Sequence, residues 1–251
     1  GFSGAVNVGL KAASTPYVIL LNNDTEPDFR YVGEMIKAIE CSPKIFSVSC
    51  KMIQLCRKEL MDDAGDMYSL LGWAYQRGVG RPCAKYNRAC RIFSACAGAA
   101  IYRREVFEEI GYFDEMHFAY LEDLDVGYRA RIAGYDNIYC PTAIVYHVGS
   151  GTSGSKYNSF KVRLAARNSV YLNYKNMPAI QLAVNLVPIL AGVGLKYLFF
   201  RKQGFAKDYV DGLMEGIATV GKCRKVPYCS RNLRNYLAIE WELFTGTLIY
   251  I

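Results

Sequence analysis

Apolar runs alternate with amphipathic segments in the first part of the chain. Residues 17–21 (YVILL) are an apolar run with β-branched members and polar flanks, which is typical of a strand buried on both faces. Residues 29–41 repeat apolar side chains at helical spacing and stop before Pro43. Residues 45–55 alternate well enough to predict a second strand. Strands that alternate with helices in this way predict an α/β domain.

The pattern breaks down over residues 58–91, which are rich in Gly, Asp, Arg and aromatic side chains. A loop of this length inside a compact domain is usually functional or mobile. Residues 94–102 (SACAGAAIY) are small and apolar and predict a tightly packed strand, in which Gly98 allows a close approach. The remaining predicted elements are a helix over 103–110, a helix ending at Gly134, and short strands over 136–140 and 143–146 on either side of Pro141.

The chain changes character after residue 158. Residues 160–174 predict a basic helix, and residues 178–200 are almost uncharged and long enough to span a bilayer. Polar residues, glycines, Pro188 and Lys196 weaken a spanning assignment. We therefore rank a membrane-surface or hairpin helix first, a true span second and a buried helix third. Basic residues on both sides favour anionic lipid headgroups, namely Lys175, Arg201, Lys202 and Lys207.

Composition adds three constraints. With 251 residues, of which 52% are hydrophobic, the chain can bury one large domain or a domain with an appendage. The formal charge of +7 lies mainly in the C-terminal part and indicates an anionic partner. No zinc-finger, helix-turn-helix or RNP-like pattern supports nucleic acid as that partner. The nine cysteines include no CxxC pair, which favours free or buried thiols in a reducing compartment.

Polar and acidic residues follow two of the predicted strands. The strand over 17–21 ends in NNDTEPD, which contains Asp24, Glu26 and Asp28, and another strand ends at His147. Ligands of open α/β sheets bind outside the carboxyl ends of the strands. The acidic run therefore predicts either a turn stabilised by Asp and Asn side chains or carboxylate ligands for a divalent metal.

Residues 118–135 (FAYLEDLDVGYRARIAGY) place Glu122, Asp123 and Asp125 directly after an aromatic run. Carboxylates stabilise the first turn of a helix, so a capping cluster is one interpretation. Apolar neighbours raise the free energy of the charged form, so a general base at the mouth of a cleft is the other. A glycine-rich stretch over residues 1–13 predicts either a phosphate-binding loop that leads into a short helix or a plain joint.

The order of these motifs, NNDTEPD, RREVFEEIGYFDE, FAYLEDLDVGYRARIAGY and PTAIVYH, resembles that of family 2 glycosyltransferases. The resemblance covers roughly residues 1–176 and is strongest to rhamnosyltransferase-like members that build cell-surface glycans. It implies an α/β fold of the GT-A type over residues 1–158, a Rossmann-like mixed sheet flanked by helices. Residues 159–251 are then a C-terminal helical, membrane-associating region.

The resemblance also implies roles for individual residues. Asp123 matches the catalytic base, with Glu122 as its neighbour, and Asp24 and His147 match a metal site for Mg²⁺ or Mn²⁺. The donor-binding positions it implies are Gly4, Asn7, Asn23, Asp24, Gly98 and Ala99. The metal would neutralise the departing diphosphate, and the base would deprotonate the attacking hydroxyl group, which contributes about 10²–10⁴-fold to the rate.

The implied partners are a nucleotide-sugar donor and a glycan or lipid-linked acceptor at the cytoplasmic face of a membrane, with inversion at the transferred sugar. Two departures from the family pattern motivate an alternative, a non-catalytic fragment that binds glycan or membrane but loads no donor. Asn22 stands where the metal-binding element usually begins with an acid. The segment expected to bind the nucleoside would also precede Gly1, so we expect the glycosyltransferase domain to be incomplete at its N-terminus.

Overall fold

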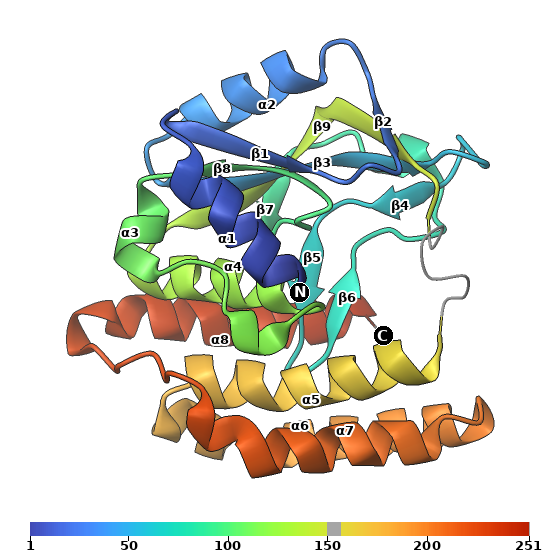
Figure 1. The fold of residues 1–251 in the computed structure, drawn as a ribbon, viewed down its shortest axis with the longest axis vertical. Coiled ribbons are helices and arrows are strands. Elements are labelled where there is room, and N and C mark those ends of the chain that lie inside the picture. The colour runs from blue at the N-terminus through green and yellow to red at the C-terminus, as the bar shows by residue number, and fades with distance from the viewer. Residues whose placement is uncertain (150–156, 251) are drawn as a thin grey trace.

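A mixed β-sheet lies at the centre of the computed structural model, which describes residues 1–149 and 157–250 (Figure 1). The parallel pair is β3 with β9, and the other pairs in the sheet are antiparallel. The strands in spatial order are β1 (Tyr17–Leu21), β8 (Ala99–Arg103), β3 (Ile45–Gln54), β9 (Asp136–His147) and β2 (Thr25–Pro27). This arrangement confirms the predicted α/β fold with a mixed sheet.

The pairing directions bring several chain segments to one edge of the sheet. Because β8 is antiparallel to both β1 and β3, and β9 is parallel to β3, the strands β1, β3 and β9 point the same way. Their carboxyl ends therefore share one edge with the amino end of β8. That edge carries residues 22–24 after β1, residues 96–98 before β8, and His147 at the end of β9.

Helices cover both faces of the sheet. On one face, α2 (Tyr31–Glu40) buries Met35 and Ile39 completely against the strands; such side chains each contribute about 1.5–3 kcal/mol when buried. The other face is covered by α1 (Phe2–Ala12), α3 (Val106–Ile110) and α4 (Glu122–Ala133). The predicted N-terminal glycine loop is wrong, because α1 is helical from Phe2 onward.

Two strand predictions need correction. The two short strands around Pro141 form one strand, β9, because a register shift opposite Cys50 and Lys51 accommodates the proline without a ladder hydrogen bond. The strand predicted over 94–102 begins only at Ala99, because residues 96–98 turn at the sheet edge.

The predicted loop over 58–91 needs correction, because it contains short strands and a 3-10 helix separated by turns. One strand pairs with β3, another pairs with β9, and two form a hairpin of their own. Met61, Asp63 and Tyr68 are buried. The elements are β4 (Met61–Asp63), β5 (Asp66–Tyr68), β6 (Ala74–Gln76), the 3-10 helix η1 (Cys83–Lys85) and β7 (Cys90–Ile92).

The C-terminal part is helical and packs below the sheet domain in Figure 1. Tyr128 of α4 shares one hydrophobic cluster with Leu172 and Leu243 from this part, so the two regions have a common core. The boundary at residue 158 stays a prediction. The elements are α5 (Ser159–Asn176), α6 (Ala179–Lys202), α7 (Ala206–Thr219) and α8 (Leu233–Tyr250), with the 3-10 helices η2 (Glu115–His117), η3 (Val220–Lys222) and η4 (Ser230–Asn232).

Helix α6 is continuous through Pro188, so it forms no hairpin within itself. Ile180 is 81% exposed and Val187 is 75% exposed, which rules out a buried helix. By length and composition α6 is able to cross a bilayer. The prediction that Lys175 is part of a lipid-facing basic flank is wrong, because this residue is buried and ion-paired with Asp125. All nine cysteines are free, as the sequence predicts.

Candidate active site

Asp24 and His147 converge at the shared edge of the sheet. Thr25, the first residue of β2, pairs with His147, and this places Asp24 beside the end of β9. The His147 Nε2 atom lies 3.4 Å from Asp24 Oδ1. Both side chains are partly shielded from solvent. The structure thus brings together the two residues predicted to bind a metal.

A second carboxylate fixes the orientation of His147. Its Nδ1 atom lies 2.7 Å from Asp62 Oδ2, and this hydrogen bond raises the pKa of the imidazole. A carboxylate only accepts hydrogen bonds, so Nδ1 carries a hydrogen, and when the ring is neutral its Nε2 lone pair faces Asp24. Asp24 Oδ1 is buried and has no hydrogen-bond partner among the described residues. With the ring neutral, this oxygen and the Nε2 lone pair face each other and fit a cation between them.

Sequence reasoning missed Asp62 because it lies in the segment predicted to be a loop. Its position depends on β4, which joins the sheet through only a short pairing with β3 at Met52 and Ile53. The signal in the sequence is the triplet Met61-Asp62-Asp63, in which alternation turns Asp62 and Asp63 to opposite faces. Two adjacent acids in a strand of three residues are hard to distinguish from a polar turn.

Asp123 lies in the first turn of α4, as predicted. The backbone N–H of Leu124 donates to its Oδ1 at 2.8 Å, and the N–H of Ala97 donates to its Oδ2 at 3.3 Å. Its side chain remains partly accessible, and burial raises its pKa. Glu122 is buried, its Oε2 has no partner in the described structure, and burial raises its pKa to about 8. Asp123 is therefore the more accessible carboxylate of the pair.

The turn over residues 96–98 connects the two halves of the site. Ala97 donates to Asp123 on one side, and Gly98 O accepts from the backbone N–H of Asn22 at 2.8 Å on the other. A Cβ on Gly98 would lie 3.2 Å from Asn22 Nδ2, so a larger residue would crowd this contact. Ala99 is buried and begins β8. The predicted acidic base and the predicted metal ligands thus lie on the two sides of one turn.

Three further groups beside Asp123 were not predicted from the sequence, namely Asp63, Asp66 and Cys96. Burial, together with the charge of Asp62, raises the pKa of Asp63 to about 7. Burial also raises the pKa of Asp66 and of Cys96 well above their ordinary values. The Asp66 carbonyl accepts from the backbone N–H of Ser94, and the Ser94 hydroxyl donates to the carbonyl of Asp123 at 2.6 Å.

The chain that enters α4 has an uncommon backbone conformation. Phe118, Tyr120 and Leu121 all have φ between +62° and +69°, a region that costs free energy for residues other than glycine. Asn168 of α5 compensates by donating through Nδ2 to the carbonyls of this segment at 2.7–2.8 Å. Arg167 donates to the carbonyl of Met116 at 3.1 Å. Helix α5 thus holds the segment that delivers Glu122 and Asp123.

Asp125 serves a different purpose from its acidic neighbours. It is completely buried, and Arg129, Lys175 and Asn176 donate to it. Its pKa is far below the ordinary value, because the charges of Arg129 and Lys175 outweigh the effect of burial. This network ties α4 to α5 and leaves Asp125 no free oxygen for a substrate.

The predicted donor-binding residues of the N-terminal segment lie on α1. Asn7 is buried, where its amide donates to the Phe113 carbonyl at 2.8 Å and accepts from the Phe113 N–H at 3.0 Å. Gly4 lies beside Glu115, and Asn23 is exposed directly after β1. Asn7 therefore anchors α1 to the segment before η2, and the roles of these residues in donor binding stay predictions.

Comparison with known proteins bears on this geometry. Residues 1–111, which carry the Asn22-Asn23-Asp24 edge and Gly98, match the model of glycosyl transferase family 2. The first 111 residues of the chain are therefore similar in sequence to this family. The resemblance inferred from the motifs is thereby confirmed, and the glycosyltransferase fold explains why polar residues gather at one edge of the sheet.

Similar proteins differ in how much of their length they share with this chain. An N-acetylglucosaminyl-diphospho-decaprenol L-rhamnosyltransferase of Mycobacterium tuberculosis (strain CDC 1551 / Oshkosh) is 42% identical over 52 residues, or 21% of this chain and 17% of that enzyme. The low-salt glycan biosynthesis hexosyltransferase Agl10 of Haloferax volcanii is 28% identical over 230 residues, or 86% of this chain and 72% of that protein. The match thus spans 17% of the first curated relatives.

A solved structure supports the fold assignment. The crystal structure of GalNAc-T7 with UDP, GalNAc and Mn²⁺ superimposes with a TM-score of 0.53 at 16% sequence identity, covering 70% of this chain and 34% of that chain. The likeness confirms the GT-A-type arrangement of the sheet and its helices.

Proposed function

We propose that this chain transfers a sugar from a nucleotide-sugar donor to a hydroxyl group of a lipid-linked or cell-surface glycan, with inversion at the anomeric carbon. The observation that carries the proposal is the convergence of Asp24 and His147 on one side of the turn over residues 96–98, with Asp123 on the other. Hexosyltransferase and rhamnosyltransferase relatives support sugar transfer as the reaction class.

Asp24 and His147 would hold Mg²⁺ or Mn²⁺. The buried, unpartnered oxygen of Asp24 and the Nε2 lone pair of His147 fit such an ion. When bound, the ion supplies charge neutralisation for the diphosphate that leaves. Asp62 holds the imidazole so that Nε2 faces Asp24. Asn23 at the same edge and Gly98 in the turn would contact the donor.

Asp123 would act as the general base. The acceptor hydroxyl group gives its proton to the Asp123 carboxylate, and its oxygen forms a bond to the anomeric carbon on the face opposite the diphosphate. The bond from that carbon to the diphosphate oxygen breaks, and its electron pair leaves with the phosphate. The amides of Ala97 and Leu124 keep the carboxylate in place. Its raised pKa makes it a stronger base than an exposed aspartate.

Donor loading is tested by calorimetry with nucleoside diphosphates in the presence and absence of Mn²⁺. We expect metal-dependent binding by the whole chain and loss of that binding in Asp24→Asn. Glu26→Gln, an exposed acid of the same sheet edge, is the matched control and should bind normally. Absence of metal-dependent binding for every nucleoside diphosphate would favour the non-catalytic alternative.

Catalysis is tested by a transfer assay with a panel of nucleotide sugars and a membrane fraction as acceptor source. We expect Asp123→Asn to lower the transfer rate by about 10²–10⁴-fold while nucleotide binding persists. Asp211→Asn, which removes an exposed acid paired with Lys207, should transfer normally. The anomeric configuration of the product, read by NMR, should be opposite to that of the donor. Full activity of Asp123→Asn would exclude Asp123 as the base.

We further propose that the protein works at the cytoplasmic face of a membrane. Helix α6 exposes apolar side chains along its length, and α8 exposes Leu237 and Trp241. Arg201 and Lys202 at the end of α6 are exposed, so they are free to meet anionic headgroups. An acceptor with a lipid anchor would bring the reaction to this surface.

A further inference from the structure

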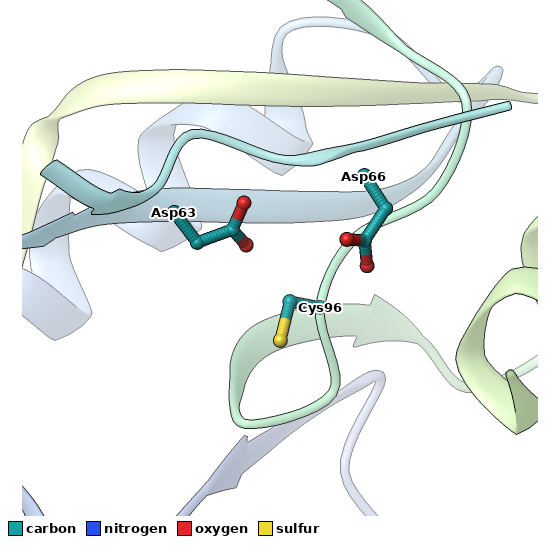
Figure 2. Close-up of side chains that lie close together, drawn as sticks. All are labelled: Asp63, Asp66 and Cys96. Atoms are coloured by element: carbon teal, nitrogen blue, oxygen red, sulfur yellow. The ribbon is translucent and has the colours of Figure 1, made fainter. Parts of the chain in front are cut away.

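Three side chains close to the proposed base form a compact cluster of metal-ligand types. Asp63 ends β4, Asp66 begins β5, and Cys96 lies in the turn before β8. Their ligand atoms lie within 4.8 Å of one another. Figure 2 shows the carboxylates of Asp63 and Asp66 facing each other across a gap, with Cys96 beside it. The turn between β4 and β5 thus meets the turn before β8, which lies thirty residues later in the chain.

Asp63 points an unpartnered oxygen into this cluster. The residue is fully buried, and its Oδ1 accepts from the backbone N–H of Gly65 at 2.9 Å. Its Oδ2 is buried and has no hydrogen-bond partner among the described residues. Gly65 has φ +95°, and a Cβ there would lie 2.5 Å from Ile92 Cδ1, so the turn that brings Asp63 and Asp66 together requires glycine.

The cluster has no compensating positive charge from the part of the chain that the structure describes. Neither Asp63 nor Asp66 forms an ion pair there, whereas the buried Asp125 is paired with both Arg129 and Lys175. An unpaired carboxylate is unfavourable in a buried position. The two carboxyl groups therefore require either a shared proton or a bound cation.

We infer that Asp63, Asp66 and Cys96 bind a divalent transition metal, with Zn²⁺ as the best match. A thiolate ligand selects Zn²⁺ and similar ions over Mg²⁺, while the carboxylates suit a tetrahedral oxygen and sulfur shell. Three protein ligands leave the fourth position to a water molecule or a substrate oxygen. Binding releases the Cys96 thiol proton and any proton that the carboxyl groups share.

The position of the cluster assigns the ion a positioning role for Asp123. Cys96 precedes Ala97, whose amide holds Asp123, and Ser94 joins the backbone of Asp66 to the carbonyl of Asp123. An ion would fasten the β4–β5 turn to the segment that supports the base. Because its test measures metal binding directly, the inference does not depend on sugar transfer.

The test uses Co²⁺ as a spectroscopic replacement for Zn²⁺ in the whole chain after treatment with a chelator. We expect an absorption band from thiolate-to-Co²⁺ charge transfer that saturates at one ion per chain. Cys96→Ser should abolish the band, and Asp63→Asn should weaken Co²⁺ binding by at least about tenfold. Cys83→Ser, at a half-buried cysteine outside the cluster, should keep the band, as should Asp24→Asn, which alters the proposed donor metal.

X-ray absorption of the Zn²⁺-loaded native chain provides a measurement that requires no folded variant. One sulfur neighbour with oxygen neighbours is the expected shell. A shell without sulfur, a band that persists in Cys96→Ser, or Zn²⁺ binding that vanishes only with Asp24→Asn would each overturn the inference. The last result would assign all metal binding to Asp24 and His147.

Discussion

The two ring nitrogens of His147 face different carboxylates, and this division decides which nitrogen is free. Asp62 accepts from Nδ1, so in the neutral ring the Nε2 lone pair is turned toward Asp24. Without Asp62 the imidazole would gain rotational freedom and the other tautomer would become accessible. The metal affinity of the proposed site would therefore depend on Asp62, a residue that is not one of the proposed ligands.

Replacing Asp62 tests this arrangement. We expect Asp62→Ala to weaken Mn²⁺ binding in the presence of nucleoside diphosphate by about 10–100-fold. Asp62→Asn should weaken it less, because its amide oxygen still accepts from Nδ1–H. Calorimetric titration with Mn²⁺ is the measurement, and Glu59→Gln on the same segment is the control. Equal affinities for Asp62→Ala and the native chain would show that the histidine needs no orientation.

At the scale of elements, α5 acts as a support for the start of α4. Asn168 is fully buried, and its amide donates to the carbonyls of His117, Ala119 and Tyr120. These bonds stabilise the positive φ angles of the segment that leads to Asp123. The C-terminal helices are therefore connected to the proposed chemistry through hydrogen bonds as well as through a shared core.

Loss of this support should affect both stability and activity. Asn168→Ala removes the side-chain donor to the partly buried carbonyls of Ala119 and Tyr120, whereas the carbonyl of His117 keeps its bond from Arg167. We expect the variant to lower the free energy of unfolding by about 1–3 kcal/mol. Transfer should fall more than nucleotide binding, because the segment positions the base and not the donor. Denaturant unfolding and the transfer assay measure the two effects. Ser169→Ala, whose hydroxyl bonds only within α5, is the control, and an equal loss in both variants would contradict the prediction.

The buried His117 gives stability a dependence on pH. Burial lowers the pKa of His117 below 6.5. As the pH falls through this value, His117 therefore binds a proton more readily in the unfolded state than in the folded state. Stability should therefore fall as the pH falls below about 6.5, with a slope of at most about 1.4 kcal/mol per pH unit from this group. The charged groups that face it are Asp114 and Asp125, which favour the proton, and Lys175 and Arg129, which oppose it.

Comparison with His117→Phe isolates this contribution from that of His147, the other histidine. The phenyl ring should preserve the edge-on contact with Tyr171. We expect the difference in unfolding free energy between the native chain and the variant to change as the pH falls from 7.5 to 5.5, in favour of the variant. Denaturant midpoints at several pH values supply the data. Parallel pH profiles would mean that His117 does not titrate in this range.

On the scale of the whole molecule, the sequence was most informative where neighbouring residues act together. The run YVILLNND predicts a strand with Asp24 after its end, and Asp123 follows a helix-start pattern, so both could be located from local periodicity. The prediction that this strand is buried on both faces is wrong, because β1 lies at the edge of the sheet and is only half-buried. Asp62, Asp63 and Asp66 could not be located, because their positions depend on a short pairing between β4 and β3. Asn168 could not be assigned either, because its partners lie about fifty residues earlier in the chain.

The charge pattern was informative only in part. Lys175 looks like a lipid-facing flank in the sequence, but it is ion-paired with the partly buried Asp114 and the buried Asp125. Arg163 and Arg167 are likewise paired, in their case with Glu215 of α7. Whether a basic residue meets solvent depends on acids that are distant in sequence. Arg201 and Lys202 are exposed, so they are better candidates for contact with a membrane than the ion-paired basic residues.

If α6 contacts a membrane, polar substitutions on its exposed apolar face should weaken the binding of the protein to lipid vesicles. Ile180, Val184 and Val187 are spaced by four and three residues, so they lie on one side of the helix, and each is at least 65% exposed. Burial of such side chains in lipid contributes about 1.5–3 kcal/mol each. We therefore expect Ile180→Gln, Val184→Gln and Val187→Gln together to weaken vesicle binding by at least about tenfold.

Co-sedimentation with phospholipid vesicles checks this expectation, using neutral vesicles and vesicles with anionic lipid. The fold should persist in the triple variant because the replaced side chains make little contact with the core, and circular dichroism verifies that. Phe29→Gln, at a side chain that is 90% exposed just before α2, is the control and should bind vesicles normally. If Arg201 and Lys202 meet headgroups, binding to anionic vesicles should fall as salt rises, whereas binding through α6 alone would be insensitive to salt. Unchanged sedimentation of the triple variant would place the membrane contact elsewhere on the molecule.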